Sequence, residues 1–186
     1  ILTYTPNEGM ISDSSINNLL SLKYKIQSLD WVHSVITLLD IPLLNSSDAP
    51  LQERLENFKT LKDEDVDKDR GFNEILSSPV FRNFVISEDG KTSGIIVNIK
   101  KDEGLQNIEE KSKDEIENYK DRIKKQNHQN ILEIRDVIKS YEDIGKIHLG
   151  GIPMIADDMM TFIKSDIIVF GLGVLLFIIV TLWYVF

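Results

Sequence analysis

The sequence predicts an α+β domain followed by a helix that crosses a membrane. Segments rich in β-branched and aromatic residues alternate with segments of helical periodicity, which is typical of mixed sheet and helix structure. An Asp-Gly pair separates two β-rich runs, and the last run of the chain, residues 167–186, contains no Asp, Glu, Lys, Arg or His. We therefore place the soluble domain at residues 1–152 and a joint with a transmembrane helix at residues 153–186.

The first part of the domain predicts a strand, a helix and a second strand. Residues 2–5 favour a short strand. A helix is expected over residues 15–29, with Asp13 or Ser14 as its cap, because apolar residues recur there at spacings of three and four. Residues 31–38 are rich in β-branched and aromatic side chains and predict the second strand.

The middle of the chain predicts a long irregular region and then a hairpin. Residues 43–80 lack a clear period and hold only a short amphipathic piece at residues 51–61. In the hairpin, residues 81–87 and 92–100 are the two arms, joined by a tight turn that contains the Asp-Gly pair.

The last part of the domain predicts a long helix and a final strand. Residues 105–143 carry apolar residues at helical spacing, and the polar stretch at 124–130 marks a break between two such sets. A strand follows at residues 146–150. Without the extra hairpin arm the order is βαββαβ, the split ferredoxin-like arrangement, with both helices on one face of the sheet.

The apolar run at residues 167–186 is long enough to cross a bilayer. About 20 residues at about 1.5 Å each span a hydrocarbon core of about 30 Å. Trp183 and Tyr184 near its end are of the type that favours the membrane surface. The chain starts at Ile1 within an apolar stretch, and no basic residue follows the span, so we expect a fragment of a longer membrane protein.

The charge of the chain restricts its function and its side of the membrane. The net charge is −9, whereas proteins that bind nucleic acid concentrate positive charge, so we expect no nucleic-acid partner. The chain has no Cys, which excludes disulfides, thiolate zinc sites and cysteine nucleophiles. Lys164 is the one base near the span and has acidic neighbours, which weakly favours a non-cytoplasmic domain.

Four segments resemble one family of transporters. They are "YTPNEG" at 4–9, "WVHSVITLLDIPLL" at 31–44, "SPVFRNFVISEDGKTSGIIVNIK" at 78–100 and "GGIPMIADDMMTFIKSD" at 150–166. The chain resembles the first extracytoplasmic porter domain and the second transmembrane helix of exporters of the resistance-nodulation-division (RND) superfamily, in the MMPL/Patched-like branch. The last segment is the most specific of the four.

The resemblance implies a function and a location. It implies part of an exporter driven by the proton-motive force, with hydrophobic or lipid-like substrates. It places residues 1–152 on the periplasmic side of the inner membrane. The implied partners are the lipid bilayer, the remaining transmembrane helices and the second porter domain of the same transporter. The proton-coupling carboxylates of the family lie in later helices, so we expect no catalytic, cofactor-binding or metal-binding residue in this chain.

Two other classes of protein are considered. The sensor domain of a membrane receptor fits the composition and the order of elements equally well. The sequence after Phe186 separates the two, because further apolar spans indicate a transporter, whereas a signalling helix with kinase motifs indicates a receptor. A membrane-anchored hydrolase has no motif in its favour, since the chain lacks a G-x-S-x-G sequence.

Two patterns resemble metal or catalytic sites, and for both we favour a structural interpretation. The acidic segment at 63–74 has carboxylates at several positions of a calcium loop, but Lys68 stands where such a loop needs glycine. We therefore expect a solvated charged loop. His33, His128 and His148 have no metal-type spacing, although His33 and His148 both lie in predicted strands and could meet across the sheet.

The joint between the last strand and the span is the candidate functional site. A ligand-binding loop is the alternative to a joint or hinge here. We expect the two glycines to adopt unusual backbone angles and the proline to lie near a helix start. We also expect Asp157 and Asp158 to lie in the first turn of the helix, where the helix dipole favours negative charge. The residues of this site are Gly150, Gly151, Pro153, Asp157, Asp158 and Asp166.

Overall fold

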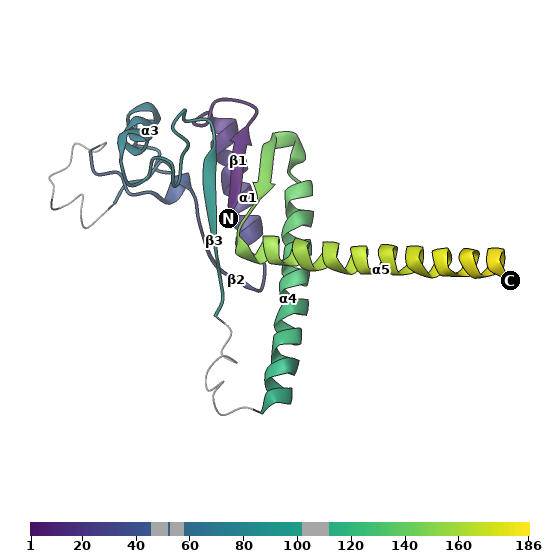
Figure 1. Cartoon of the computed structure of the whole chain (residues 1–186). Coiled ribbons are helices and arrows are strands. Elements are labelled where there is room, and N and C mark those ends of the chain that lie inside the picture. Colours follow the sequence, from purple (N-terminus) through teal and green to yellow (C-terminus); the bar gives the residue numbers. More distant parts are fainter. Residues whose placement is uncertain (46–51, 53–57, 102–111) are drawn as a thin grey trace.

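The computed structural model describes residues 1–45, 52, 58–101 and 112–186, and Figure 1 shows how they are arranged. The fold is α+β, with a four-stranded antiparallel sheet, two long helices packed on it, and a C-terminal helix that runs away from the domain. The start of the predicted long helix (105–111) and most of the predicted amphipathic piece at 51–61 lie outside the described residues.

Four of the five predicted strands form, and they share one sheet. Its order is β2-β3-β1-β4, and every neighbouring pair is antiparallel. Leu2 lies opposite Ile95 on one side and Leu149 on the other, which fixes the register around the central strand. The strands are β1 (Leu2–Pro6), β2 (Val32–Ile36), β3 (Ser93–Ile99) and β4 (Gly145–Leu149).

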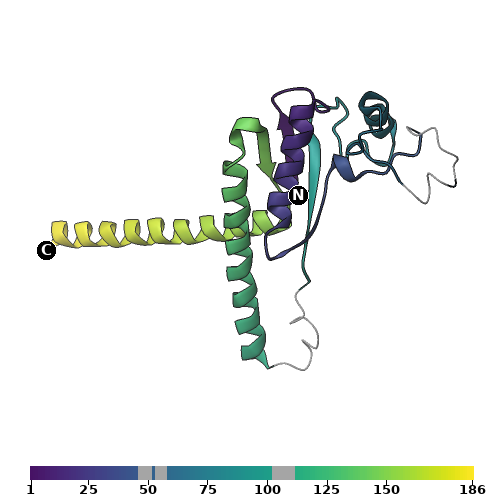
Figure 2. The ribbon, with the colours of Figure 1, turned by 180° about the vertical axis from the view of Figure 1, so that it is seen from behind.

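The two helices pack on the sheet and on each other. They are α1 (Asp13–Gln27) and α4 (Lys113–Lys139), and both cover the face that is turned to the viewer in Figure 2. A hydrogen bond of 2.8 Å joins the hydroxyl of Ser21 in α1 to that of Tyr141, two residues after the end of α4. The cap of α1 is Ser12, one residue before the predicted Asp13, because its side chain accepts from the Ser15 N–H.

Alternate strand residues and one stripe of each helix form the core. Leu2, Tyr4 and Ile95 point inward and are fully buried, as periodicity of two requires. Leu22 of α1 and Ile134 of α4 are among the helix residues that join the same cluster. Each such aliphatic side chain contributes about 1.5–3 kcal/mol by leaving water, so the core holds both helices on the sheet.

The first arm of the predicted hairpin is not a strand. Within 81–87, only Ile86 makes an isolated bridge to Ser93 of β3. The Phe81 carbonyl instead accepts backbone hydrogen bonds from Phe84, Val85 and Ile86, which coils this arm into a turn. The turn between the arms forms as expected, with Gly90 at a φ of 69°.

A further helix lies in the region predicted to be irregular. Helix α3 (Lys68–Ser77) is capped by Asp67, whose side chain accepts from the Arg70 N–H at 3.0 Å. Gly71 lets α3 pack closely against the side chain of Leu43, since a Cβ at residue 71 would lie only 2.8 Å from it. The prediction of an irregular loop was therefore wrong for this part, and a cap within a dense run of charges was the missed signal.

The predicted break at 124–130 does not occur, because α4 is continuous from Lys113 to Lys139. The last helix, α5 (Ile152–Val185), is also continuous. Within the described part of the chain, α5 is the one helix long and apolar enough to cross a membrane, with a mean hydropathy of 2.7 in its apolar window. Figures 1 and 2 show that α5 starts beside α4, crosses it and extends away from the domain.

Candidate functional site at the joint of domain and helix α5

Two glycines connect the sheet to α5. Strand β4 ends at Leu149 and α5 begins at Ile152. Gly150 still pairs beside β1, because its N–H donates to the Ile1 carbonyl at 2.9 Å. Gly151 has a φ of 114°, a conformation that side chains with a Cβ rarely adopt. The expectation of an unusual backbone angle is confirmed for Gly151, whereas Gly150 has no positive φ.

The first turn of α5 packs against the domain. Pro153 lies at the helix start, as predicted, where its missing N–H is not needed. Pro153 and Met154 border a small apolar cavity of about 50 Å³, together with Trp31 and Ile131 among others. The Asn127 side-chain amide donates to the Pro153 carbonyl at 2.9 Å, so α4 contacts the very start of α5.

The first carboxylate of the joint is held by a histidine of α4. Asp157 has only 9% of its side chain exposed, and its oxygens lie 2.9 and 3.1 Å from Nδ1 of His128. An ionised carboxylate can only accept, so Nδ1 is the donor of this contact in the tautomer that carries its proton there. Asp157 is therefore both buried and partnered, which is the arrangement that a buried charge requires.

The second carboxylate is held by an arginine two turns further along α4. Both oxygens of Asp158 accept from Nη2 of Arg135, at 2.8 and 2.9 Å. Neither aspartate lies in the first turn of α5, so the prediction that the helix dipole places them was wrong. Since the helix already starts at Ile152, both fall in its second turn and reach across to α4 instead.

The structure brings together five of the six predicted site residues. Asp166 is eight residues beyond Asp158, about 12 Å further along α5, and is exposed. Three α4 side chains that complete the joint were not predicted from the sequence, because residues 124–130 were expected to break the helix. Their spacing of one, seven and eight residues, which places them on one helix face, was the signal available. They are Asn127, His128 and Arg135.

The other histidines do not meet. His33 is in β2 and His148 is in β4, and these two strands form opposite edges of the sheet with β3 and β1 between them. The suggestion that they meet across the sheet was therefore wrong. The strand order separates them.

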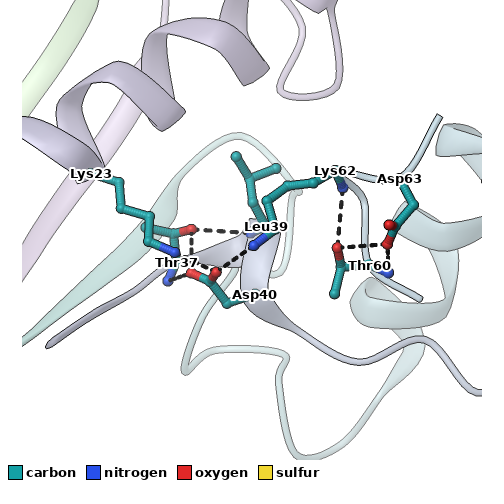
Figure 3. A network of polar contacts seen from close by, with 7 residues as sticks. All are labelled: Lys23, Thr37, Leu39, Asp40, Thr60, Lys62 and Asp63. Carbon is teal, nitrogen blue, oxygen red and sulfur yellow. Dashed lines mark hydrogen bonds and ion pairs between the residues drawn. The ribbon is translucent and has the colours of Figure 1, made fainter. Parts of the chain in front are cut away.

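A second charged cluster stabilises the domain rather than forming an open site. Asp40 accepts from Lys23 of α1 and from Lys62, the latter at 2.9 Å, and its second oxygen accepts from the N–H and hydroxyl of Thr37 (Figure 3). Burial alone would raise the pKa of Asp40, but the hydrogen bonds from both lysines and Thr37 together lower it. The cluster thus ties the turn after β2 to α1 and to the chain before α3.

The acidic segment at 63–74 has partners of its own. Asp63 accepts from the Thr60 N–H at 2.7 Å, and Asp65 pairs with Lys59 at 3.0 Å. Asp67 caps α3, as described above. Across residues 1–45, 52, 58–101 and 112–186, no group of three His, Cys, Asp or Glu side chains is placed to hold a metal ion.

Comparison with protein-family models gives no match for this chain, and comparison with curated proteins gives none. What the joint can do is mechanical, since it fastens a folded domain to a membrane-length helix through a two-residue link and a set of contacts from α4.

Proposed function

We propose that this chain is the first extracytoplasmic porter domain, with the second transmembrane helix, of a proton-driven exporter of the RND superfamily in its MMPL/Patched-like branch. The observation that carries the proposal is the direct attachment of a sheet edge to a helix of membrane-spanning length. Only Gly150 and Gly151 separate β4 from α5, and α4 grips the first turns of α5. A movement of such a domain would be transmitted directly to the membrane-spanning helix.

The sheet supports a ferredoxin-like domain within this proposal. Read from the other edge, the strand order is β4-β1-β3-β2, with α1 connecting β1 to β2 and α4 connecting β3 to β4. Each crossover passes over one strand, and all neighbours are antiparallel. These are the relations expected for a split βαββαβ unit, into which α3 and its flanking segments are inserted.

The side of the membrane, the substrate and the partners follow from the resemblance. We place residues 1–152 in the periplasm, with α5 crossing the inner membrane from residue 167 onward. Hydrophobic or lipid-like molecules would pass through apolar clefts between this domain and the second porter domain of the same transporter. The bundle formed by the remaining membrane helices would supply the proton pathway.

Membrane topology is the first property to test. The chain has no Cys, and Glu117 is exposed on α4, so Glu117→Cys introduces a single labelling site into it. In intact cells with a permeable outer membrane, we expect a membrane-impermeant maleimide to react at residue 117. A cysteine that reacts only after the inner membrane is lysed would contradict the periplasmic placement.

Export is tested with the full-length protein in cells that lack their own efflux pumps. We expect the protein to lower accumulation of hydrophobic dyes, and we expect collapse of the proton gradient to cancel this effect. The sequence that follows Phe186 separates the exporter from the receptor alternative. A signalling helix with kinase motifs there, in place of further apolar spans, would overturn the exporter proposal.

The contribution of the joint is tested by Gly151→Val, with Gly150→Val as the matched control. A side chain at residue 151 must adopt the positive φ, whereas a Cβ at residue 150 meets nothing closer than the Ile1 carbonyl oxygen at 4.0 Å. We expect Gly151→Val to reduce export per molecule in the membrane more than the control does. Equal export by both variants would show that the joint tolerates the change.

A further inference from the structure

A cleft lies between α4 and α5. It is on the side of α4 that faces the apolar end of α5. It has a volume of about 360 Å³. The contacts that fix α4 to α5 involve Pro153, Asp157 and Asp158, whereas the α5 lining of the cleft continues to Thr161 and Lys164. The cleft therefore opens along the part of α5 that leads into its apolar run.

The cleft is basic within an acidic protein. Lys124 and Lys125 line it from α4, and Lys164 lines it from α5, although the net charge of the chain is −9. Among the described residues, neither Lys125 nor Lys164 has an ion-pair partner, and Lys124 has only an exposed contact of 3.5 Å with Asp121. The amino groups are thus available to an anion.

The carboxylates nearby do not neutralise the cleft. Asp157 lines it, but this side chain already contacts His128, which lines the cleft as well. Asp158 is held by Arg135. Asp166 comes two residues after Lys164, which is about 200° around the helix, and so points to another side of α5. The net charge that faces the cleft is therefore positive.

The cleft is also at the depth of lipid headgroups if α5 crosses a membrane. Lys164 precedes the apolar run by three residues, about 4.5 Å along the helix axis. Lysine side chains at the ends of spanning helices extend toward the headgroups. Met160 adds an apolar wall on the α5 side, and the Thr161 hydroxyl adds a hydrogen-bond donor.

We propose that this cleft binds the phosphate headgroup of an anionic phospholipid. The three lysines would surround the phosphate, and the acyl chains would run along the apolar surface of α5. A bound headgroup would bridge α4 and α5 and so add a lipid contact to the joint. The proposal rests on the proposed membrane crossing of α5, but not on export or on the family.

The test uses the full-length protein purified in detergent and titrated with phosphatidylglycerol, phosphatidylcholine or inorganic phosphate, with bound molecules counted by native mass spectrometry. The variant is Lys124→Gln/Lys125→Gln/Lys164→Gln. The control, Lys113→Gln/Lys120→Gln/Lys146→Gln, removes the same charge at exposed positions that do not line the cleft. The melting temperature of each variant verifies that it is folded.

We expect phosphatidylglycerol to bind more tightly than phosphatidylcholine. Each lysine near an anionic lipid surface contributes about fivefold in affinity, so the cleft variant should lose about 100-fold and the control less than tenfold. Equal losses in both variants, or binding of inorganic phosphate with no preference for the lipid, would overturn the proposal. A protein absent from the membrane fraction would instead refute the membrane crossing itself, and with it the proposed function.

Discussion

Gly151→Ala measures how much the joint depends on its backbone conformation. At a φ of 114°, an alanine is strained by about 1–3 kcal/mol, although the space is open, since its Cβ would lie 3.6 Å from the nearest atom, the Ile1 nitrogen. For a chain of this size, 1 kcal/mol lowers the melting temperature by about 2–4 °C. We therefore expect the full chain in detergent to melt about 2–12 °C lower.

Gly150→Ala is the matched control for this prediction. The two glycines are adjacent, both lie outside a helix or strand, and both gain the same methyl group, but residue 150 has no positive φ. We expect Gly150→Ala to change the melting temperature by less than 2 °C, about what ordinary surface substitutions do. Equal melting of the two variants would refute the reasoning, because it would show that the joint relaxes to another conformation without cost.

Three further changes test contacts within the domain and between α4 and α5. Gly145→Ala should destabilise the fold by about 3 kcal/mol, measured by urea unfolding, because its Cβ would overlap the Thr5 carbonyl where β1 pairs with β4. Asp40→Asn should weaken the fold above about pH 4 and flatten the loss of stability at lower pH. The pKa of Asp40 is lower in the folded chain than in the unfolded chain. Asp40 therefore stabilises the fold at any pH above its pKa in the unfolded chain, and this stabilisation is lost as the pH falls through its pKa in the folded chain. A double-mutant cycle of Arg135→Ala and Asp158→Ala should give a coupling energy of about 0.5–1 kcal/mol, since both side chains are partly exposed.

The sequence predicted the strands and the two long helices because their patterns are local. Alternation of apolar residues in β1 and β3 and helical spacing in α1 and α4 reflect which side of each element faces the core, and the core is where burial stabilises the fold. The prediction of a strand at 81–87 was wrong, and the pattern of side chains could not show why. Its β-rich side chains suit a strand, but backbone bonds to the Phe81 carbonyl fold it back on itself.

The partners at the joint could not be predicted because they are far apart along the chain. Asp157 is 29 residues from His128, and Asp158 is 23 residues from Arg135. The glycines and the proline were recognised by their local backbone role, and that role needs no knowledge of neighbours. The aspartates looked like dipole partners because the sequence could not show that α4 continues through 124–130 and passes beside α5.

The contacts from α4 restrict how the joint can act. Asp157 and Asp158 are adjacent and so point about 100° apart around α5, while their partners, His128 and Arg135, are seven residues apart on α4. The two pairs thus hold α5 from two directions and at two positions along α4. A rotation of α5 about its axis, or a tilt of α5, would therefore separate at least one pair. Gly151 supplies a link that can bend, but the pairs oppose the bend. With the pairs intact, we therefore expect the domain and α5 to move as one body, and we expect Gly151 to act as the proposed hinge only in a state in which α4 has released α5.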